Sequence, residues 1–157
     1  MKIHFVCSGN TFRSRLAEAY LRSRLKEKNI SNVEVSSSGT DAQHNSYGPA
    51  AWYTLRILHD NRLISFMSPN WKKTTRNDVE KSDLVVFMKD MHLQYCKKEF
   101  NIQPENYLIL DIDDVFPSEI HAMYKEKYEA DIEIMKRTDA IFKELRTKID
   151  KILESAL

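Results

Sequence analysis

Apolar residues are distributed along the chain in two different patterns. Short apolar runs, several of them rich in β-branched residues, predict β-strands. Between the runs, apolar residues recur every three or four positions, which is the spacing of an amphipathic helix. The strands are expected at about residues 1–7, 33–37, 83–88 and 107–110, and the helices at about 14–28, 49–59, 77–81, 91–100 and 120–156.

This alternation of strands and helices predicts an α/β fold. Residues 83–88 form an uninterrupted apolar run, which is typical of a central parallel strand that is buried on both faces. Parallel neighbours require crossover helices, and such crossovers are right-handed. We therefore expect three layers, in which a four-stranded parallel sheet is flanked by helices. No linker or repeat interrupts the pattern, so residues 1–157 are predicted to form one domain.

Two of the helical patterns carry more specific expectations. In the first, Leu16 and Leu21 mark an apolar face, so Arg15 and Glu18 are expected on the other side of the helix. The last pattern has one apolar stripe, with charged residues elsewhere. It predicts a single long amphipathic helix, from about residue 120 to 156, that covers one face of the sheet.

The segment between the first strand and the first helix has the features of a phosphate-binding loop. It is expected at the carboxyl end of a strand, where parallel sheets bind their ligands. Successive backbone N–H groups and a helix N-terminus attract an anion there, and an arginine adds a bidentate fork for phosphate oxygens. Glycine and asparagine tolerate the left-handed backbone of such a loop. The predicted loop consists of Ser8, Gly9, Asn10, Thr11, Phe12, Arg13 and Ser14.

Cys7 lies directly before this loop and is the candidate nucleophile. A thiol beside a cation and a helix N-terminus loses its proton readily, and a thiolate below a bound phosphate attacks phosphorus. The alternative is a small buried hydrophobic residue, which is the commoner role of a lone cysteine. The five-residue spacing between Cys7 and Arg13 also occurs by chance. The direct succession of strand, loop and helix favours the catalytic interpretation.

Composition narrows the possible classes of function. With 157 residues the chain is long enough for a substantial core, and its 24 basic and 23 acidic residues leave a net charge of +1. This balance gives no reason to expect nucleic-acid or membrane binding. Two cysteines make no disulfide framework, and no zinc-like spacing occurs, so neither metal nor cofactor is expected. The absence of a signal peptide or membrane-length apolar segment predicts a reduced, cytoplasmic location.

The loop residues also carry a resemblance to a known family. Cys7, Gly9, Asn10, Arg13 and Ser14, at the start of a chain of this length, are similar to the low-molecular-weight protein tyrosine phosphatases. The resemblance extends over nearly the whole chain. It implies hydrolysis of phosphomonoesters through a phosphocysteine intermediate. The implied substrate is a phosphotyrosine-containing protein or a small aryl phosphate, and no oligomeric state is specified.

The resemblance directs attention to an acidic loop after the fourth predicted strand. Departure of the leaving group requires a proton, which the family supplies from an aspartate in an Asp-Pro-aromatic sequence. Aligning Phe116 with the aromatic residue makes Asp114 the general acid and Val115 the replacement for proline. Asp113 is the second candidate and Asp111 the third. The alternative is that all three aspartates belong to an ordinary solvated loop.

The resemblance also suggests one supporting residue, and the sequence departs from the family pattern in several places. Ser37 falls where a serine of the family hydrogen-bonds the phosphate loop, although by itself it would be read as part of a serine-rich turn. Phe12 replaces a cysteine that often protects the nucleophile from oxidation. The rim aromatic of the family falls near Gln43 and His44. Residues 60–76 lack the histidine often found near the serine network.

Two other classes of function remain as alternatives. Arsenate reductases of the same fold use the same loop but need further cysteines in series, and Cys96 is the only other thiol. It lies in an ordinary helical pattern, which favours a packing role. The third class is a non-catalytic anion-binding relative that has kept the loop. Intact Cys7 and Arg13 favour the phosphatase over both alternatives.

Overall fold

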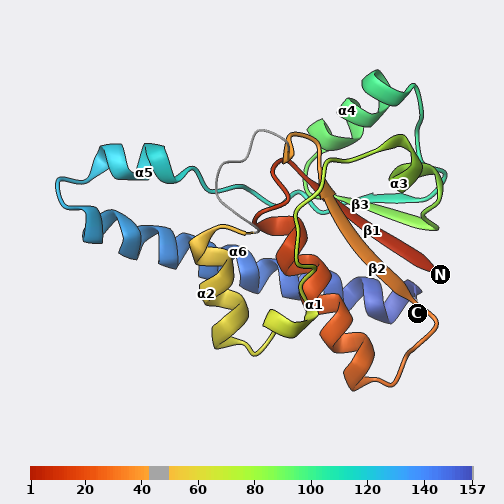
Figure 1. Cartoon of the computed structure of the whole chain (residues 1–157), viewed down its shortest axis with the longest axis horizontal. Helices are drawn as coiled ribbons and strands as arrows, with labels where there is room; N and C mark the ends of the chain where they lie inside the picture. Colours follow the sequence, from red (N-terminus) through yellow and green to blue (C-terminus); the bar gives the residue numbers. More distant parts are fainter. Residues whose placement is uncertain (43–49, 157) are drawn as a thin grey trace.

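A parallel sheet with helices on both faces forms the centre of the protein (Figure 1). The computed structural model describes residues 1–42 and 50–156. All neighbouring strands of the sheet are parallel, and their order is β2-β1-β3-β4. This arrangement confirms the predicted α/β fold with its four-stranded sheet. The strands are β1 (Lys2–Cys7), β2 (Glu34–Gly39), β3 (Leu84–Phe87) and β4 (Tyr107–Ile109).

Helices cover the two faces of the sheet unequally. In Figure 1 the first, second and last helices lie on one side of the strands, while α3 and α4 lie on the other. Because the side chains of a strand alternate between faces, each strand supplies both layers. The helices are α1 (Arg13–Glu27), α2 (Trp52–Asp60), α3 (Arg76–Glu80), α4 (Asp90–Phe100), α5 (Pro117–Met123) and α6 (Lys127–Ala156), with a short 3₁₀ helix at Ile64–Phe66.

The alternation along β1 and β3 is visible in the two hydrophobic clusters. Ile3 and Phe5 of β1, with Val86 of β3, join the larger cluster against α1 and α6. Val85 and Phe87 point the other way and pack with residues of α3 and α4. Residues of β1 and β3 are therefore buried on both faces, as the continuous apolar run of β3 predicts.

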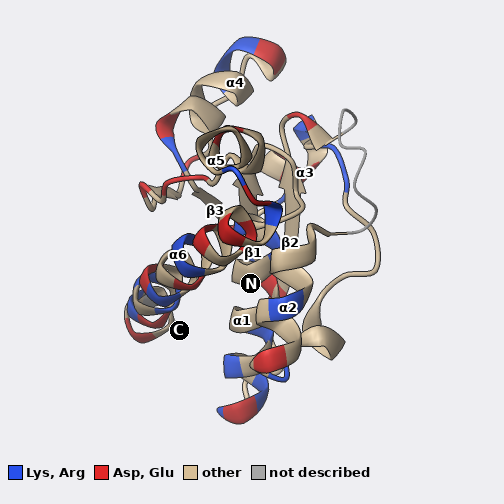
Figure 2. Cartoon of the chain, turned by 90° about the vertical axis from the view of Figure 1, so that its left-hand side faces the viewer, with Lys and Arg blue, Asp and Glu red and all other residues tan. Residues whose placement is uncertain are grey.

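The C-terminal segment differs from the single helix predicted for it. It forms α5 and α6, separated at Tyr124, whose backbone is extended with φ −120° and ψ 143°. Tyr124 packs against the main hydrophobic cluster, so a tertiary contact interrupts the helical pattern. Acidic and basic residues are interleaved along α6 in Figure 2. Among the described helices, none is both long and apolar enough to cross a membrane.

The side of α1 opposite Leu16 and Leu21 is also buried. Arg15 and Glu18 are both fully buried, because the 3₁₀ helix and the segment after it cover the side of α1 that carries the charges. A guanidinium N–H of Arg15 donates to the backbone carbonyl of Ser68. Burial of charged groups is tolerated only with such partners. The network around Glu18 is described with the site.

Candidate active site

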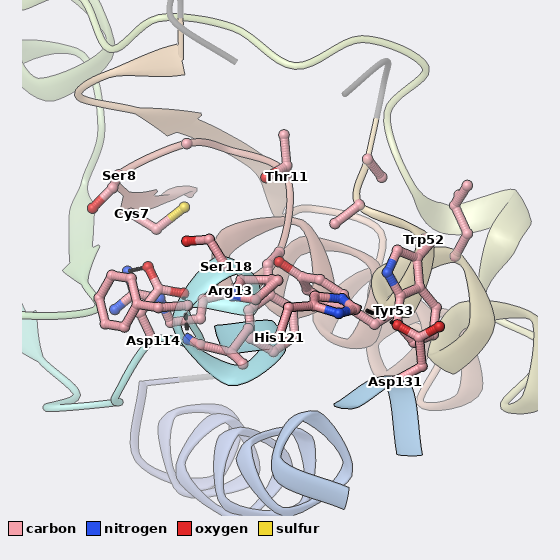
Figure 3. A pocket seen from close by; sticks show the side chains of 18 of the residues that line it. Cys7, Ser8, Thr11, Arg13, Trp52, Tyr53, Asp114, Ser118, His121 and Asp131 are labelled. Atoms are coloured by element: carbon pink, nitrogen blue, oxygen red, sulfur yellow. Dashed lines mark hydrogen bonds and ion pairs between the residues drawn. The ribbon is translucent and has the colours of Figure 1, made fainter. Parts of the chain in front are cut away.

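A pocket of about 810 Å³ opens beyond the carboxyl end of β1 (Figure 3). Cys7 and Arg13 belong to its lining, together with Trp52 from α2 and Asp114 from the loop after β4. The parallel strands end at this edge of the sheet, which is where α/β folds place their ligands. Residues far apart in the sequence therefore meet in one cavity.

Cys7 lies at the base of the loop and is almost completely buried, with 2% of its surface exposed. The backbone N–H of Asn10 donates to its Sγ atom over 3.2 Å, and the Oγ of Ser14 lies 2.9 Å from the same sulfur. Asn10 has a φ of 54°, the left-handed backbone expected for it. The loop thus surrounds the sulfur with groups that can donate hydrogen bonds to it.

A buried network holds this loop from behind. The amide Nδ2 of Asn10 donates to the hydroxyl oxygens of Ser14 and Ser37, each over 2.9 Å. Ser37 in turn donates to Oε2 of Glu18 over 2.6 Å. Ser37 therefore contacts the loop through Asn10. Glu18 is an additional member of the network that the sequence analysis did not identify.

Glu18 occupies the far end of this network, and residues 60–76 contain no histidine that could do so. Its carboxylate pairs with the guanidinium of Arg22 over 2.8 Å and accepts a hydrogen bond from Ser68. A buried carboxylate needs such compensation. The only sequence signal for the pair was the spacing of Glu18 and Arg22, which are four residues apart in a helix.

Arg13 joins the loop to the acidic segment after β4. Its Nη1 donates to the backbone carbonyl of Ile112 over 2.9 Å, and its Nη2 pairs with Oδ2 of Asp114 over 2.5 Å. The Nε–H of Arg13 is buried and has no hydrogen-bond partner among residues 1–42 and 50–156. One donor of the guanidinium is consequently available to an anion in the pocket, and two others are shared with the acidic loop.

The other two aspartates of this loop lie away from the pocket. Asp111 and Asp113 both pair with Nζ of Lys89, over 2.7 and 2.6 Å. Asp113 is 85% exposed, whereas Asp114 is 27% exposed. The hydrogen bond from Lys89 lowers the pKa of Asp111, which makes that carboxyl a poorer proton donor. Of the three candidates, only Asp114 lines the pocket.

The two cysteines are held in separate parts of the core. Cys7 belongs to the cluster on the α1 side of the sheet and Cys96 to the cluster on the α4 side. Burial raises the pKa of Cys96 to about 11, so its thiol stays protonated at neutral pH. Phe12 is also buried, and its ring packs edge-to-face on Tyr53 with 5.1 Å between the centroids. Phe12 is therefore a core residue of the loop.

The mouth of the pocket is partly aromatic. Trp52 is 45% exposed, and Phe116 is 57% exposed. Gln43 and His44, the expected rim positions, lie outside the described residues. The far end of the pocket contains an acidic residue that the sequence analysis did not single out. There Asp131 of α6 lies 3.2 Å from the ring of His121 of α5 and is paired with Lys127 (Figure 3).

Gly39 lies against the backbone of the phosphate loop, so a substitution there tests how tightly the loop is held. A Cβ atom at this position would lie 2.5 Å from the carbonyl oxygen of Ser8 and 2.6 Å from the amide nitrogen of Asn10. Gly39→Ala is expected to lower the free energy of unfolding by about 1–3 kcal/mol, which is typical of overpacking. It should also weaken phosphate binding, because the loop must shift. Denaturant unfolding and phosphate titration measure both effects.

Glu34→Ala is the matched control for that substitution, since Glu34 lies at the exposed start of the same strand. We expect it to change neither quantity appreciably. If Gly39→Ala is as stable as the wild type and binds phosphate equally well, the loop is not held against this strand.

The fold and the loop together define the class of protein, and comparison with known families agrees. The family model for low molecular weight phosphotyrosine protein phosphatase matches residues 2–156. The chain belongs to this family and is an enzyme of the low-molecular-weight phosphatase type. This confirms the resemblance drawn from the loop residues.

The relatives in this family differ in the substrate that their names give. The chain is 29% identical over 155 residues to the protein-arginine-phosphatase of Bacillus subtilis (strain 168), covering 98% of this chain and 97% of that protein. It is 53% identical over 61 residues to the low molecular weight protein-tyrosine-phosphatase PtpA of Staphylococcus aureus (strain MRSA252), a match that covers 39% of each.

Solved structures show the same fold. The low molecular weight protein tyrosine phosphatase from T. tengcongensis superposes with a TM-score of 0.75 at 23% identity, over 98% of both chains. The Drosophila arginine phosphatase superposes with a TM-score of 0.71 at 20% identity, over 98% of this chain and 96% of that one.

Proposed function

We propose that the protein hydrolyses phosphate from protein side chains through a phosphocysteine intermediate on Cys7. The observation that carries this proposal is the meeting of Cys7, Arg13 and Asp114 in one pocket, although the last lies about a hundred residues from the others in sequence. A nucleophile, an anion-binding cation and a proton donor are the groups that such hydrolysis requires. Cys7 and Arg13 are supplied by one loop.

In the first step the sulfur of Cys7 attacks phosphorus. The S–P bond forms as the bond to the leaving oxygen breaks, and Asp114 gives its proton to that oxygen. Arg13 and the loop amides stabilise the negative charge of the transferred group. The backbone N–H of Asn10 and the nearby hydroxyl of Ser14 hold the sulfur in position for attack.

In the second step water attacks the phosphocysteine. The carboxylate of Asp114, now deprotonated, takes a proton from that water, the P–S bond breaks, and inorganic phosphate leaves with Cys7 restored as thiolate. Before the first step, Asp114 must separate from Arg13, because phosphate oxygens compete for the same guanidinium. Neither step requires a metal ion or an organic cofactor.

For the substrate we propose phosphotyrosine in a protein, with a small aryl phosphate as its minimal form. The exposed rings of Trp52 and Phe116 at the pocket mouth support this assignment, because a phenol ring packs favourably between aromatic side chains.

A second candidate is phosphoarginine. It is supported by the relative matched over almost the whole chain, which is named a protein-arginine-phosphatase. Aromatic faces also bind guanidinium groups, and Asp41 and Asp131 add carboxylates to the pocket lining. The bond broken would then be P–N in place of P–O, with Asp114 protonating the leaving nitrogen.

Steady-state hydrolysis of matched peptides separates the two candidates. Peptides of identical sequence carrying phosphotyrosine or phosphoarginine are compared by kcat/KM, with a phosphoserine peptide as control. We expect the phosphotyrosine peptide to be cleaved and the phosphoserine peptide to be inert. If kcat/KM is at least tenfold higher for the phosphoarginine peptide, phosphoarginine is the substrate in place of phosphotyrosine. No release of phosphate from any peptide or aryl phosphate supports the non-catalytic alternative.

The arsenate reductase alternative has less support from the structure. Passing a disulfide along requires a second thiol near the nucleophile. Cys96 is buried on the opposite face of the sheet from Cys7. Arsenate-dependent consumption of a reducing thiol, measured with the same preparation, tests this alternative directly.

A further inference from the structure

A buried histidine next to the phosphate loop has its proton position determined by its neighbours. His92, in the first turn of α4, is fully buried. The backbone N–H of Lys89 donates to its Nδ1 over 3.1 Å, and a backbone amide can only donate. Burial, with the nearby charge of Arg13, lowers the pKa of His92 to about 3, so the ring is neutral at neutral pH. Its single proton is therefore on Nε2.

The proton on Nε2 of His92 determines whether Ser8 accepts or donates the hydrogen bond between them. Nε2 of His92 lies 2.9 Å from Oγ of Ser8, so the ring donates and the serine oxygen accepts. The hydroxyl proton of Ser8 must then point elsewhere. The Ser8 side chain has no other hydrogen-bond partner in the described part of the chain, and Ser8 lines the pocket with Cys7 and Arg13.

The oxygens that enter this pocket during the proposed reaction are those of the phosphoryl group. The backbone N–H of Asn10 already donates to the sulfur of Cys7, and the Ser14 hydroxyl lies 2.9 Å from the same atom. Asp114 is engaged with Arg13 and with the backbone N–H of Val115. An unpaired hydroxyl donor at the edge of the pocket is therefore suited to a non-bridging phosphate oxygen, which is a strong acceptor.

We propose that the hydroxyl of Ser8 donates a hydrogen bond to the bound phosphoryl group, and that His92 is the positioning residue that keeps Ser8 in this donor orientation. The inference rests on the proposed function for the identity of the ligand. The direction of donation runs from the Lys89 amide to His92, from His92 to Ser8, and from Ser8 to phosphate. It connects the start of α4 to the phosphate site.

Inhibition and binding by inorganic phosphate test the role of Ser8. A hydrogen bond to a charged group is worth roughly tenfold or more in affinity. Ser8→Ala should therefore raise the dissociation constant of phosphate, measured by calorimetry, and the inhibition constant of vanadate by about that factor. Ser8→Thr, which keeps the hydroxyl, should restore binding to within about threefold. Ser31→Ala, at an exposed serine outside the pocket lining, should leave both constants unchanged.

If His92 acts through Ser8, a substitution of His92 should affect phosphate binding only when Ser8 is present. His92→Leu should weaken phosphate binding in the wild-type background and add nothing further in the Ser8→Ala background. Nitrogen NMR of the wild type should show the Nε2–H tautomer for His92, which the donor orientation of Ser8 requires. This measurement does not depend on whether the leucine variant folds.

Three results would overturn the proposal: unchanged phosphate affinity in Ser8→Ala, an Nδ1–H tautomer in the wild type, or fully additive losses in the double variant. Because phosphate binding is measured without turnover, these outcomes are distinct from failure of the proposed function. A wild type that binds phosphate but releases none from any substrate contradicts the proposed function and leaves the comparison of Ser8 variants valid.

Discussion

Cys7→Ser is expected to reduce phosphatase turnover by roughly 10⁴-fold or more, to background, because removal of a covalent nucleophile has effects of that order. A serine hydroxyl at this position is not ionised near neutral pH, so it does not attack phosphorus at a useful rate. Phosphate binding should persist, because the loop amides and Arg13 remain in place. The measurement is steady-state hydrolysis of an aryl phosphate, combined with calorimetric titration of inorganic phosphate.

Cys96→Ser is the matched control for this substitution. Cys96 is buried in α4, and its raised pKa keeps it a thiol. We expect the control to retain turnover. Vanadate and phosphate should inhibit the wild type competitively, and chelators should have no effect. Appreciable hydrolysis by Cys7→Ser would exclude the phosphocysteine mechanism.

Asp114→Asn is expected to lower kcat by roughly 10²–10⁴-fold for a poor leaving group, such as the phenol of a phosphotyrosine peptide, because a positioned general acid contributes that much. The loss should shrink for p-nitrophenyl phosphate, whose leaving group departs without protonation. Asparagine keeps the size of the side chain and can still accept a hydrogen bond from Arg13. The expected loss of kcat therefore results from the missing proton donor and not from displacement of the loop.

Asp113→Asn provides the control in the neighbouring position. Its carboxylate is 85% exposed and is paired with Lys89 outside the pocket, so its substitution should change kcat only slightly. If Asp113→Asn shows the large loss that depends on the leaving group, the acid is one residue earlier than proposed. If neither variant shows it, the loop supplies no acid and the non-catalytic alternative gains support.

Much of the fold was predictable from sequence because its signals are local. The apolar run over residues 83–88 predicts a buried parallel strand, and the observed β3 has every residue buried. The succession of strand, loop and helix around Cys7 is likewise local, since the residues that form the loop are neighbours in the chain. The left-handed backbone at Asn10 was expected because asparagine tolerates that conformation.

The choice among the three aspartates was not predictable in the same way. Asp113 and Asp114 are adjacent and chemically identical, and neighbouring side chains of an extended segment point in different directions. The cations that separate them come from distant parts of the chain: Lys89 after β3 and Arg13 at the start of α1. Which carboxylate enters the pocket therefore depends on the packing of the strands.

The partners of buried polar groups were also decided by the tertiary structure. Periodicity within α1 placed Glu18 on the side away from the apolar face, and contacts with Ser37 and with residues 64–68 bury it. The pairing of Ser8 with His92 joins two elements that are 84 positions apart in sequence. Local pattern thus determined where the phosphate loop forms, since its geometry needs only neighbouring residues. The groups that surround the loop were decided by the tertiary structure, because hydrogen bonds between distant segments leave no period in the sequence.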